Sequence, residues 1–426
     1  MAMASLSVAR QAGAHSRNQS VHTRADVPGT QTPLNTTPVP FSLLIVVAVL
    51  VATGLATVYV AVLSDSDYSF SRQVMGVGLG VVVMILFWVF DYRNFDKMVV
   101  PLLVLDVVLI LLPMVPGLGV EINGATSWVK IGSFTFQPSE LAKPVTIVMV
   151  AAACSKYGGK ITRGKDYFKM LALVLVPFLL LVTEDLGTAL VIFIFGFFIL
   201  WVAGSSHKWL LLTLGVIIAL VAAVLGLNGV VSAWTGGNVQ LIEDYQMSRL
   251  MVFLDQDNEE YADDAYNLNQ AKIAVGSGEI SGKGFGNATQ SSGGFLPEPA
   301  TDFIFCVFAE QYGFIGCFVL LALYLALFAS ALNVGLKSSD LLGLLITVGV
   351  MGMWLFQIVE NIGMDLGLMP ITGIPLPFMS YGSSFMLTNF ICVGLLCSIW
   401  ARREGVRSKS KKKQGKAGQL NVKDAR

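Results

Sequence analysis

Charged residues are scarce in this chain. Asp, Glu, Lys and Arg make up only 13% of its 426 residues, whereas 54% are hydrophobic. A soluble globular protein carries about 25% charged residues, so the deficit excludes a chain whose surface lies mostly in water. It indicates a protein whose main solvent is the lipid bilayer. The 28 basic and 28 acidic residues balance, so the net charge itself indicates no partner; we expect no nucleic-acid partner for such a membrane protein.

Histidine and cysteine are also rare, and the few present lack the spacing of a metal site. The three histidines, His15, His22 and His207, lie far apart, which argues against a zinc site built from them. The five cysteines fall in or beside apolar segments, so we predict buried thiols rather than a disulfide framework. These cysteines are Cys154, Cys306, Cys317, Cys392 and Cys397.

The first 40 residues contain no apolar run. They are rich in Ser, Thr, Gln, Pro and Gly and include three arginines, a composition typical of disorder. We therefore predict a disordered cytoplasmic tail over 1–40. Because the first hydrophobic stretch begins only after this tail, we expect no cleavable signal peptide. The chain also shows no inverted repeat of the kind found in transporters.

Long apolar segments make up most of the remaining chain. An α-helix needs about 20 apolar residues to cross the ~30 Å hydrocarbon core. Candidates lie near 41–63, 74–90, 97–115, 138–156, 167–183, 186–204, 209–232, 302–334, 340–363 and 376–400. We therefore predict an all-α, polytopic membrane protein with about ten transmembrane helices, its membrane domain covering 41–400.

The distribution of Lys and Arg predicts the topology, because cytoplasmic loops are enriched in both. Basic residues gather in the loops around 91–97 and 155–169 and in the tail 401–426. These segments can all be cytoplasmic only if 167–204 crosses the membrane twice, turning at Thr183–Asp185. Both termini are then cytoplasmic. The basic tail is expected to contact anionic membrane lipids.

The longest predicted loop, 233–301, then lies outside the cell. It has short helical patterns over 249–254 and 266–275, followed by a glycine-dense stretch at 276–286. A long loop with elements of its own is usually functional. Its basic residues, Arg249, Lys272 and Lys283, stand out among many acidic ones. Each alone is typical of a surface charge, but together they could bind a pyrophosphate.

Asp302 is the strongest candidate for chemistry. It lies where the long outer loop enters a very apolar segment. Partial desolvation there raises a carboxyl pKa towards that of a useful general base. The alternative is a helix cap, because Thr301 and Asp302 both favour helix starts. Position alone leaves both interpretations open.

Two further polar clusters lie at predicted helix starts. Glu140 and Lys143 share a helix face by their i,i+3 spacing, which predicts either an internal ion pair or a lysine that meets a phosphate. The stretch 374–384 combines proline and glycine near membrane depth, which favours backbone lining a cavity. Its hydroxyls, Ser380 and Tyr381, are candidate substrate contacts; the alternative is a bent re-entrant segment without a ligand.

Three acidic residues lie within predicted spans. We interpret Asp106 as structural, and leave Glu310 and Glu360 open between interhelical contacts and function. Counting along one helix from Asp302, Glu310 would lie two turns below it on a similar face.

Several strings together resemble the SEDS family (shape, elongation, division and sporulation proteins), and RodA-like members more than FtsW or SpoVE. The resemblance covers roughly 40–400. The strings are Gln137-Pro-Ser-Glu140 with Lys143, Asp185-Leu-Gly-Thr188, Asn267 to Gly284, Thr289-Gln290, Leu296-Pro-Glu298, Thr301 to Phe305, Ala309-Glu310, Asn361 to Met364 and Met369 to Gly382.

The resemblance implies a ten-span peptidoglycan glycosyltransferase in the bacterial cell (inner) membrane, which polymerises lipid II at the outer face of that membrane and releases undecaprenyl diphosphate. The family's essential aspartate falls on Asp302, and its cavity residues on Glu140 and Lys143. Lys143, Arg249 or a divalent cation (Mg or Mn) would stabilise the departing diphosphate. The implied partner is a class B penicillin-binding protein. Further predicted substrate contacts are Gln137, Ser139, Gln270, Lys283, Gln290, Glu298 and Thr301.

Two other functions fit the same architecture. A lipid II flippase would use Asp302 and Glu140 to line its route, and an inactive scaffold would only activate the penicillin-binding protein.

The chain departs from the family pattern at Ser127, Glu184 and Ser383, and at Ala300, where a histidine is usual. These departures suggest a divergent lineage.

Overall fold

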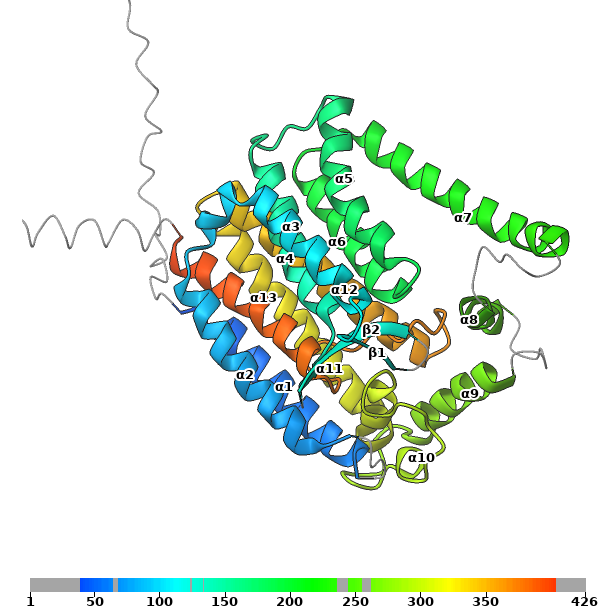
Figure 1. The fold of residues 1–426 in the computed structure, drawn as a ribbon. Coiled ribbons are helices and arrows are strands. Elements are labelled where there is room, and N and C mark those ends of the chain that lie inside the picture. The colour runs from blue at the N-terminus through cyan, green and yellow to red at the C-terminus, as the bar shows by residue number, and fades with distance from the viewer. Residues whose placement is uncertain are drawn as a thin grey trace, which may run out of the picture. The chain divides into compact units, whose positions relative to one another are not determined.

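The computed structural model describes residues 39–63, 68–122, 125–132, 134–235, 244–254 and 262–403 (Figure 1). Almost all of the two predicted tails lies outside the described residues. Helices dominate the described chain, which confirms the predicted helical fold class.

Ten of the described helices coincide with the ten predicted spans. They are α1 (Phe41–Ala61), α2 (Phe70–Val89), α3 (Val99–Leu111), α4 (Pro138–Ser155), α5 (Gly164–Leu181), α6 (Leu186–Val202), α7 (His207–Thr235), α11 (Ile304–Leu336), α12 (Leu341–Asp365) and α13 (Ser383–Ala401). Among the described residues, α1, α2, α11, α12 and α13 are long and apolar enough to cross a membrane, and α3, α6 and part of α7 are shorter apolar helices. Separate helices α5 and α6 confirm that 167–204 is not one span.

Helices α4, α12 and α13 form the centre of this membrane domain. Almost every residue of α4 and α13 is buried. Helix α13 packs along α2 and against α4, while α12 packs against α4, α6 and α11 (Figure 1). Small residues allow the backbones to approach: a Cβ added at Gly394 would lie 2.6 Å from the Met84 carbonyl oxygen. The central helices therefore position the segments that meet at their ends.

A small antiparallel sheet lies in the connection between α3 and α4. Its strands are β1 (Gly119–Ile122), β2 (Ala125–Ile131) and β3 (Phe134–Phe136), in the order β1-β2-β3. Short 3-10 helices, η1 (Tyr92–Lys97) and η2 (Leu112–Met114), flank α3. The sequence analysis did not predict this sheet, because its strands are only three to seven residues long.

The long loop before α11 is built from α8 (Asp244–Leu254), α9 (Ala262–Ser277) and α10 (Thr289–Ser292). The two helical patterns predicted in it are confirmed as α8 and α9. Helix α9 packs against α11 and α12. The side chain of Lys272 of α9 reaches Gly367, just beyond the C-terminal end of α12. The helix dipole stabilises a positive charge at this end.

Helix α11 is interrupted at Gly313, which has a positive φ of 62°. The glycine-dense loop before α10 fills the interruption: Lys283 N donates to Glu310 O (3.0 Å) and Phe314 N donates to Glu279 O (2.9 Å). Backbone groups freed by a break at membrane depth must find such partners. The predicted span over 302–334 is therefore found as α11 with a break at Gly313, which the sequence analysis did not predict, and Asp302 lies just before the start of this helix.

Candidate functional site

Asp302 lies in a short non-helical segment held by its main chain. The three consecutive carbonyls of 300–302 accept hydrogen bonds from Tyr381 N (2.8 Å), Ser380 Oγ (2.7 Å) and Asn361 Nδ2 (2.7 Å), respectively. We call these three bonds the carbonyl clamp. They tie the segment to α12 and to the loop before α13. The backbone that carries the Asp302 side chain is therefore fixed by contacts from outside α11.

Ser380 is a part of this clamp rather than an open hydroxyl. It is fully buried, and its Oγ also accepts from Leu376 N at 2.8 Å. Both of these bonds are to backbone, which differs from the predicted substrate contact. Tyr381 is half-buried; its hydroxyl accepts from Ser69 N at 3.5 Å.

The Asp302 carboxylate and the guanidinium of Arg249 of α8 both lie next to the backbone of Gly373. A Cβ added at Gly373 would lie 2.9 Å from Asp302 Oδ2 and 3.9 Å from Arg249 Nη1. The positive φ of Gly373, 72°, also disfavours any side chain here. The acid and the guanidinium therefore flank the same bare stretch of backbone.

Burial raises the pKa of Asp302 to about 7, and the charge of Glu298 acts in the same direction. Arg249 opposes the shift, and Asp185 adds to it. The residue nevertheless remains partly exposed. A carboxyl group with a raised pKa and partial exposure can take up and release a proton near neutral pH.

Glu298 is oriented by two hydroxyls. Thr301 Oγ1 donates to Glu298 Oε2 at 3.1 Å, and the Tyr68 hydroxyl donates to the same oxygen. Glu298 has a positive φ of 44°, which is uncommon for a residue with a side chain. The Tyr68 ring in turn packs edge-on against Tyr381. Glu298 and Thr301 thus lie beside Asp302, and their contact with a substrate stays a prediction.

The cluster at the start of α4 is a buried ion pair. Lys143 Nζ lies 2.6 Å from Glu140 Oε1, and both side chains are almost completely buried. This favours the predicted internal ion pair over a lysine open to a phosphate. Ser139 is buried beside it, and its hydroxyl has no hydrogen-bond partner among the described residues.

Asp185 links this cluster to Asp302; the sequence placed it in a short turn and in a family string, but it was not predicted as a site residue. Its Oδ1 caps α6 by accepting from Thr188 N (2.9 Å), and its Oδ2 accepts from Gln137 Nε2 (3.1 Å). Its charge acts on Asp302 and on Glu140. The available signal was its position as an acidic residue in the very short turn between two apolar spans.

Lys283 and Gln290 gather around Glu310 instead of Asp302. Lys283 Nζ lies 2.7 Å from Glu310 Oε1, and Gln290 N and Thr289 Oγ1 both donate to that oxygen at 3.0 Å. Glu310 is fully buried, so it anchors the loop that fills the break in α11. Gln270 lies half-buried on α9. Of the three basic residues that the sequence analysis named in the long loop, Arg249 is the one placed at Asp302.

Replacing Lys283 with alanine should destabilise the protein. The buried Glu310 carboxylate would lose a charge-assisted hydrogen bond, a change typically worth about 2 kcal/mol. We expect a lower midpoint of thermal unfolding in detergent. Lys208, exposed at the start of α7, offers the matched control: Lys208→Ala should leave the midpoint unchanged. Equal midpoints for both variants would contradict the anchoring role.

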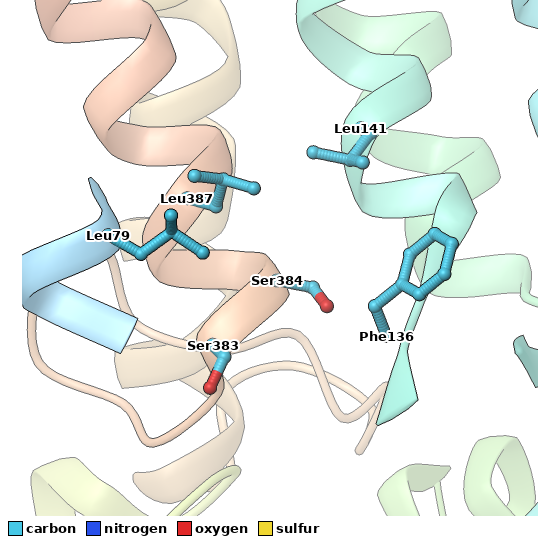
Figure 2. A pocket seen from close by; sticks show the side chains of 6 residues that line it. All are labelled: Leu79, Phe136, Leu141, Ser383, Ser384 and Leu387. Carbon is cyan, nitrogen blue, oxygen red and sulfur yellow. The ribbon is translucent and has the colours of Figure 1, made fainter. Parts of the chain in front are cut away.

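An apolar cavity of about 160 Å³ opens beside the start of α13. Leu79 of α2, Phe136 of β3 and Leu141 of α4 line it, together with Ser383, Ser384 and Leu387 of α13 (Figure 2). Ser384 Oγ accepts from Gln137 N at 3.0 Å, which connects the cavity wall to the cluster at the start of α4. Within the described residues, no group of three or more His, Cys, Asp or Glu could hold a metal ion.

Comparisons with known proteins agree on one family. The model of a cell cycle protein family named for FtsW, RodA and SpoVE matches residues 36–405. The peptidoglycan glycosyltransferase MrdB of Escherichia coli K12 is 35% identical over 297 residues, covering 70% of this chain and 76% of that protein. The peptidoglycan glycosyltransferase RodA of Treponema pallidum is 33% identical over 381 residues, covering 76% and 87%.

Solved structures agree as well. The rod shape determining protein RodA of Thermus thermophilus matches with a TM-score of 0.62 and 28% identity, covering 88% of this chain and 99% of that one. A chain from a peptidoglycan synthase complex that coordinates polymerization and crosslinking matches with a TM-score of 0.68 and 29% identity, covering 87% and 99%. On this sequence and structural evidence, the chain belongs to the FtsW, RodA and SpoVE family, a polytopic membrane protein family.

Proposed function

We propose that this chain is a peptidoglycan glycosyltransferase that polymerises lipid II at the outer face of a bacterial cell membrane, with Asp302 as its general base. The observation that carries the proposal is the carboxylate of Asp302, a partly exposed residue whose main-chain segment is clamped at three carbonyls and which an arginine flanks. It stands in a chain whose curated relatives are named peptidoglycan glycosyltransferases.

The reaction joins two lipid-linked sugars. A hydroxyl of one sugar attacks the anomeric carbon of the other, a new C–O bond forms, and the bond to the undecaprenyl diphosphate breaks. Asp302 accepts the proton of the attacking hydroxyl, a role typically worth about 10²–10⁴-fold in rate. Arg249 is suited to the negative charge that develops on the departing diphosphate, because its planar guanidinium can donate two hydrogen bonds to phosphate oxygens.

The apolar cavity supports a lipid-anchored substrate. Leu79, Phe136, Leu141 and Leu387 present hydrocarbon to it (Figure 2), and Gln137 borders it through its bond to Ser384. A short segment of a polyprenyl tail in this cavity, next to the diphosphate, would place the diphosphate near Gln137 and Asp185. The substrate would thus reach Asp302 without leaving the membrane.

The rate of polymerisation should depend on pH through Asp302. Only the deprotonated carboxylate accepts a proton, and the pKa of Asp302 is raised to about 7 by burial and by Glu298, against Arg249. The rate should therefore fall about tenfold per pH unit below 7 and level off above it. Initial rates of glycan formation from labelled lipid II between pH 5.5 and 9 measure this. A rate independent of pH down to 5.5 would contradict the assignment.

The proposed partner is a class B penicillin-binding protein, whose transpeptidase would crosslink the new glycan. Support comes from the matched chain of a synthase complex that coordinates polymerization and crosslinking. The proposed placement has both termini in the cytoplasm, because the basic loops then lie inside. A divalent cation that assists the departing diphosphate also stays a prediction.

A further inference from the structure

We propose that Asn361 is the positioning residue that holds Asp302 against the loop carrying Gly373, an inference that rests on the proposed function. Asn361 lies on α12, one of the central helices, and is fully buried. It does not need to touch substrate to act. Its effect would pass through the backbone of two segments that meet at the site.

One side-chain amide nitrogen, that of Asn361, donates hydrogen bonds to both the Asp302 segment and the loop that carries Gly373. Asn361 Nδ2 donates to Asp302 O at 2.7 Å and to Ile374 O at 2.9 Å. A primary amide carries two N–H groups on one planar nitrogen, and both are used here. The main chain of Asp302 and that of Ile374 are therefore fixed relative to each other by one side chain.

The fixed distance matters because Ile374 directly follows Gly373. The Asp302 carboxylate and the Arg249 guanidinium both lie against Gly373. A second tether supports the same loop: the Thr372 hydroxyl donates to the buried Glu360, the residue before Asn361. A shift of this loop would change the position of the base relative to the arginine.

The chemistry of the position favours a neutral amide. Leucine has a similar volume but no N–H, so both buried carbonyls would lose a partner. An ionised aspartate could donate neither bond and would add a charge near Asp302. Glutamine keeps both N–H groups on a chain that is one carbon longer.

These differences define the test on the full-length purified protein. We expect Asn361→Leu to lower kcat for lipid II roughly 100-fold, the scale of a small misplacement of a catalytic group. KM should change little. Loosening the clamp should also hydrate Asp302, so the acid limb of the pH–rate profile should move about one unit towards lower pH.

The groups that act on Asp302 in this profile include Glu298, Arg249 and Asp185. Glu360 and Asp365 of α12, together with Tyr68, also couple to Asp302 electrostatically. None of them is altered in Asn361→Leu, so a shift reports the position of Asp302. Asn361→Gln should recover a part of kcat and of the wild-type acid limb.

Asn389 provides a matched control. It is an equally buried amide on α13, where Nδ2 donates to Phe385 O at 2.8 Å and Oδ1 accepts from Trp354 Nε1 at 2.8 Å. Asn389→Leu makes the same chemical change without touching the Asp302 segment. It should leave the acid limb where it is in the wild type, whatever it does to stability.

The outcomes separate this inference from the proposed function. An unshifted acid limb in Asn361→Leu, or an equal shift in Asn389→Leu, would overturn the positioning role while the wild type still polymerises. Should Asp302→Asn polymerise as fast as the wild type, the base assignment itself would fail. A shift confined to the Asn361 variants supports the inference.

Discussion

Replacing Asp302 with asparagine is expected to lower the rate of glycan polymerisation by at least ~10²-fold, and up to ~10⁴-fold. The amide cannot accept the proton of the attacking hydroxyl. The carbonyl clamp should survive, because its three bonds involve only the backbone of 300–302. The measurement is the initial rate of glycan formation from labelled lipid II by purified protein.

Asp106→Asn is the matched control for this prediction. Asp106 is a fully buried acidic residue away from the Asp302 segment, and its Oδ2 accepts from Thr146 Oγ1 between α3 and α4. Its loss should leave polymerisation within a few-fold of the wild type. If Asp302→Asn retained wild-type polymerisation, or if both variants lost it equally, Asp302 would not be the base.

Replacing Arg249 with alanine should cause the second-largest loss, about 10²–10³-fold in kcat. This is the typical cost of removing a donor that stabilises charge developing in a transition state. Arg249 lies at Gly373 beside the Asp302 carboxylate, whereas Lys283 is paired with Glu310. The measurement is kcat for lipid II, taken at pH 8.5 so that Asp302 is deprotonated.

Arg249→Lys refines this prediction. It keeps the positive charge but loses the planar fork that binds a phosphate with two parallel bonds. Its rate should fall between those of the wild type and Arg249→Ala. Unchanged kcat in Arg249→Ala, with the loss confined to KM, would assign the residue to ground-state binding instead.

Much of the membrane domain could be predicted from the sequence, because long apolar runs have few alternatives in a bilayer. The distribution of Lys and Arg even separated α5 from α6, which a hydropathy argument alone would merge. The short strands β1 to β3 carry no comparable signal. The break at Gly313 was not predicted either. A single glycine inside an apolar run does not indicate that the loop 279–284 will hydrogen-bond to the interrupted helix.

The site shows the same division. Asp302 could be singled out as an acidic residue entering an apolar segment, and Glu140 with Lys143 as a spaced pair. The sequence could not choose among Arg249, Lys272 and Lys283, because that choice depends on contacts across the fold. It also gave no sign that Ser380 and Asn361 hold carbonyls, since a hydroxyl or an amide looks the same whether it faces a substrate or backbone.

Purified wild-type protein given lipid II, with and without the proposed penicillin-binding partner, tests the central claim most directly. Our account predicts a ladder of glycan strands on a gel, which disappears in Asp302→Asn under the same conditions. A wild type that moves lipid II across sealed vesicles but never forms glycan, even with its partner, would contradict it.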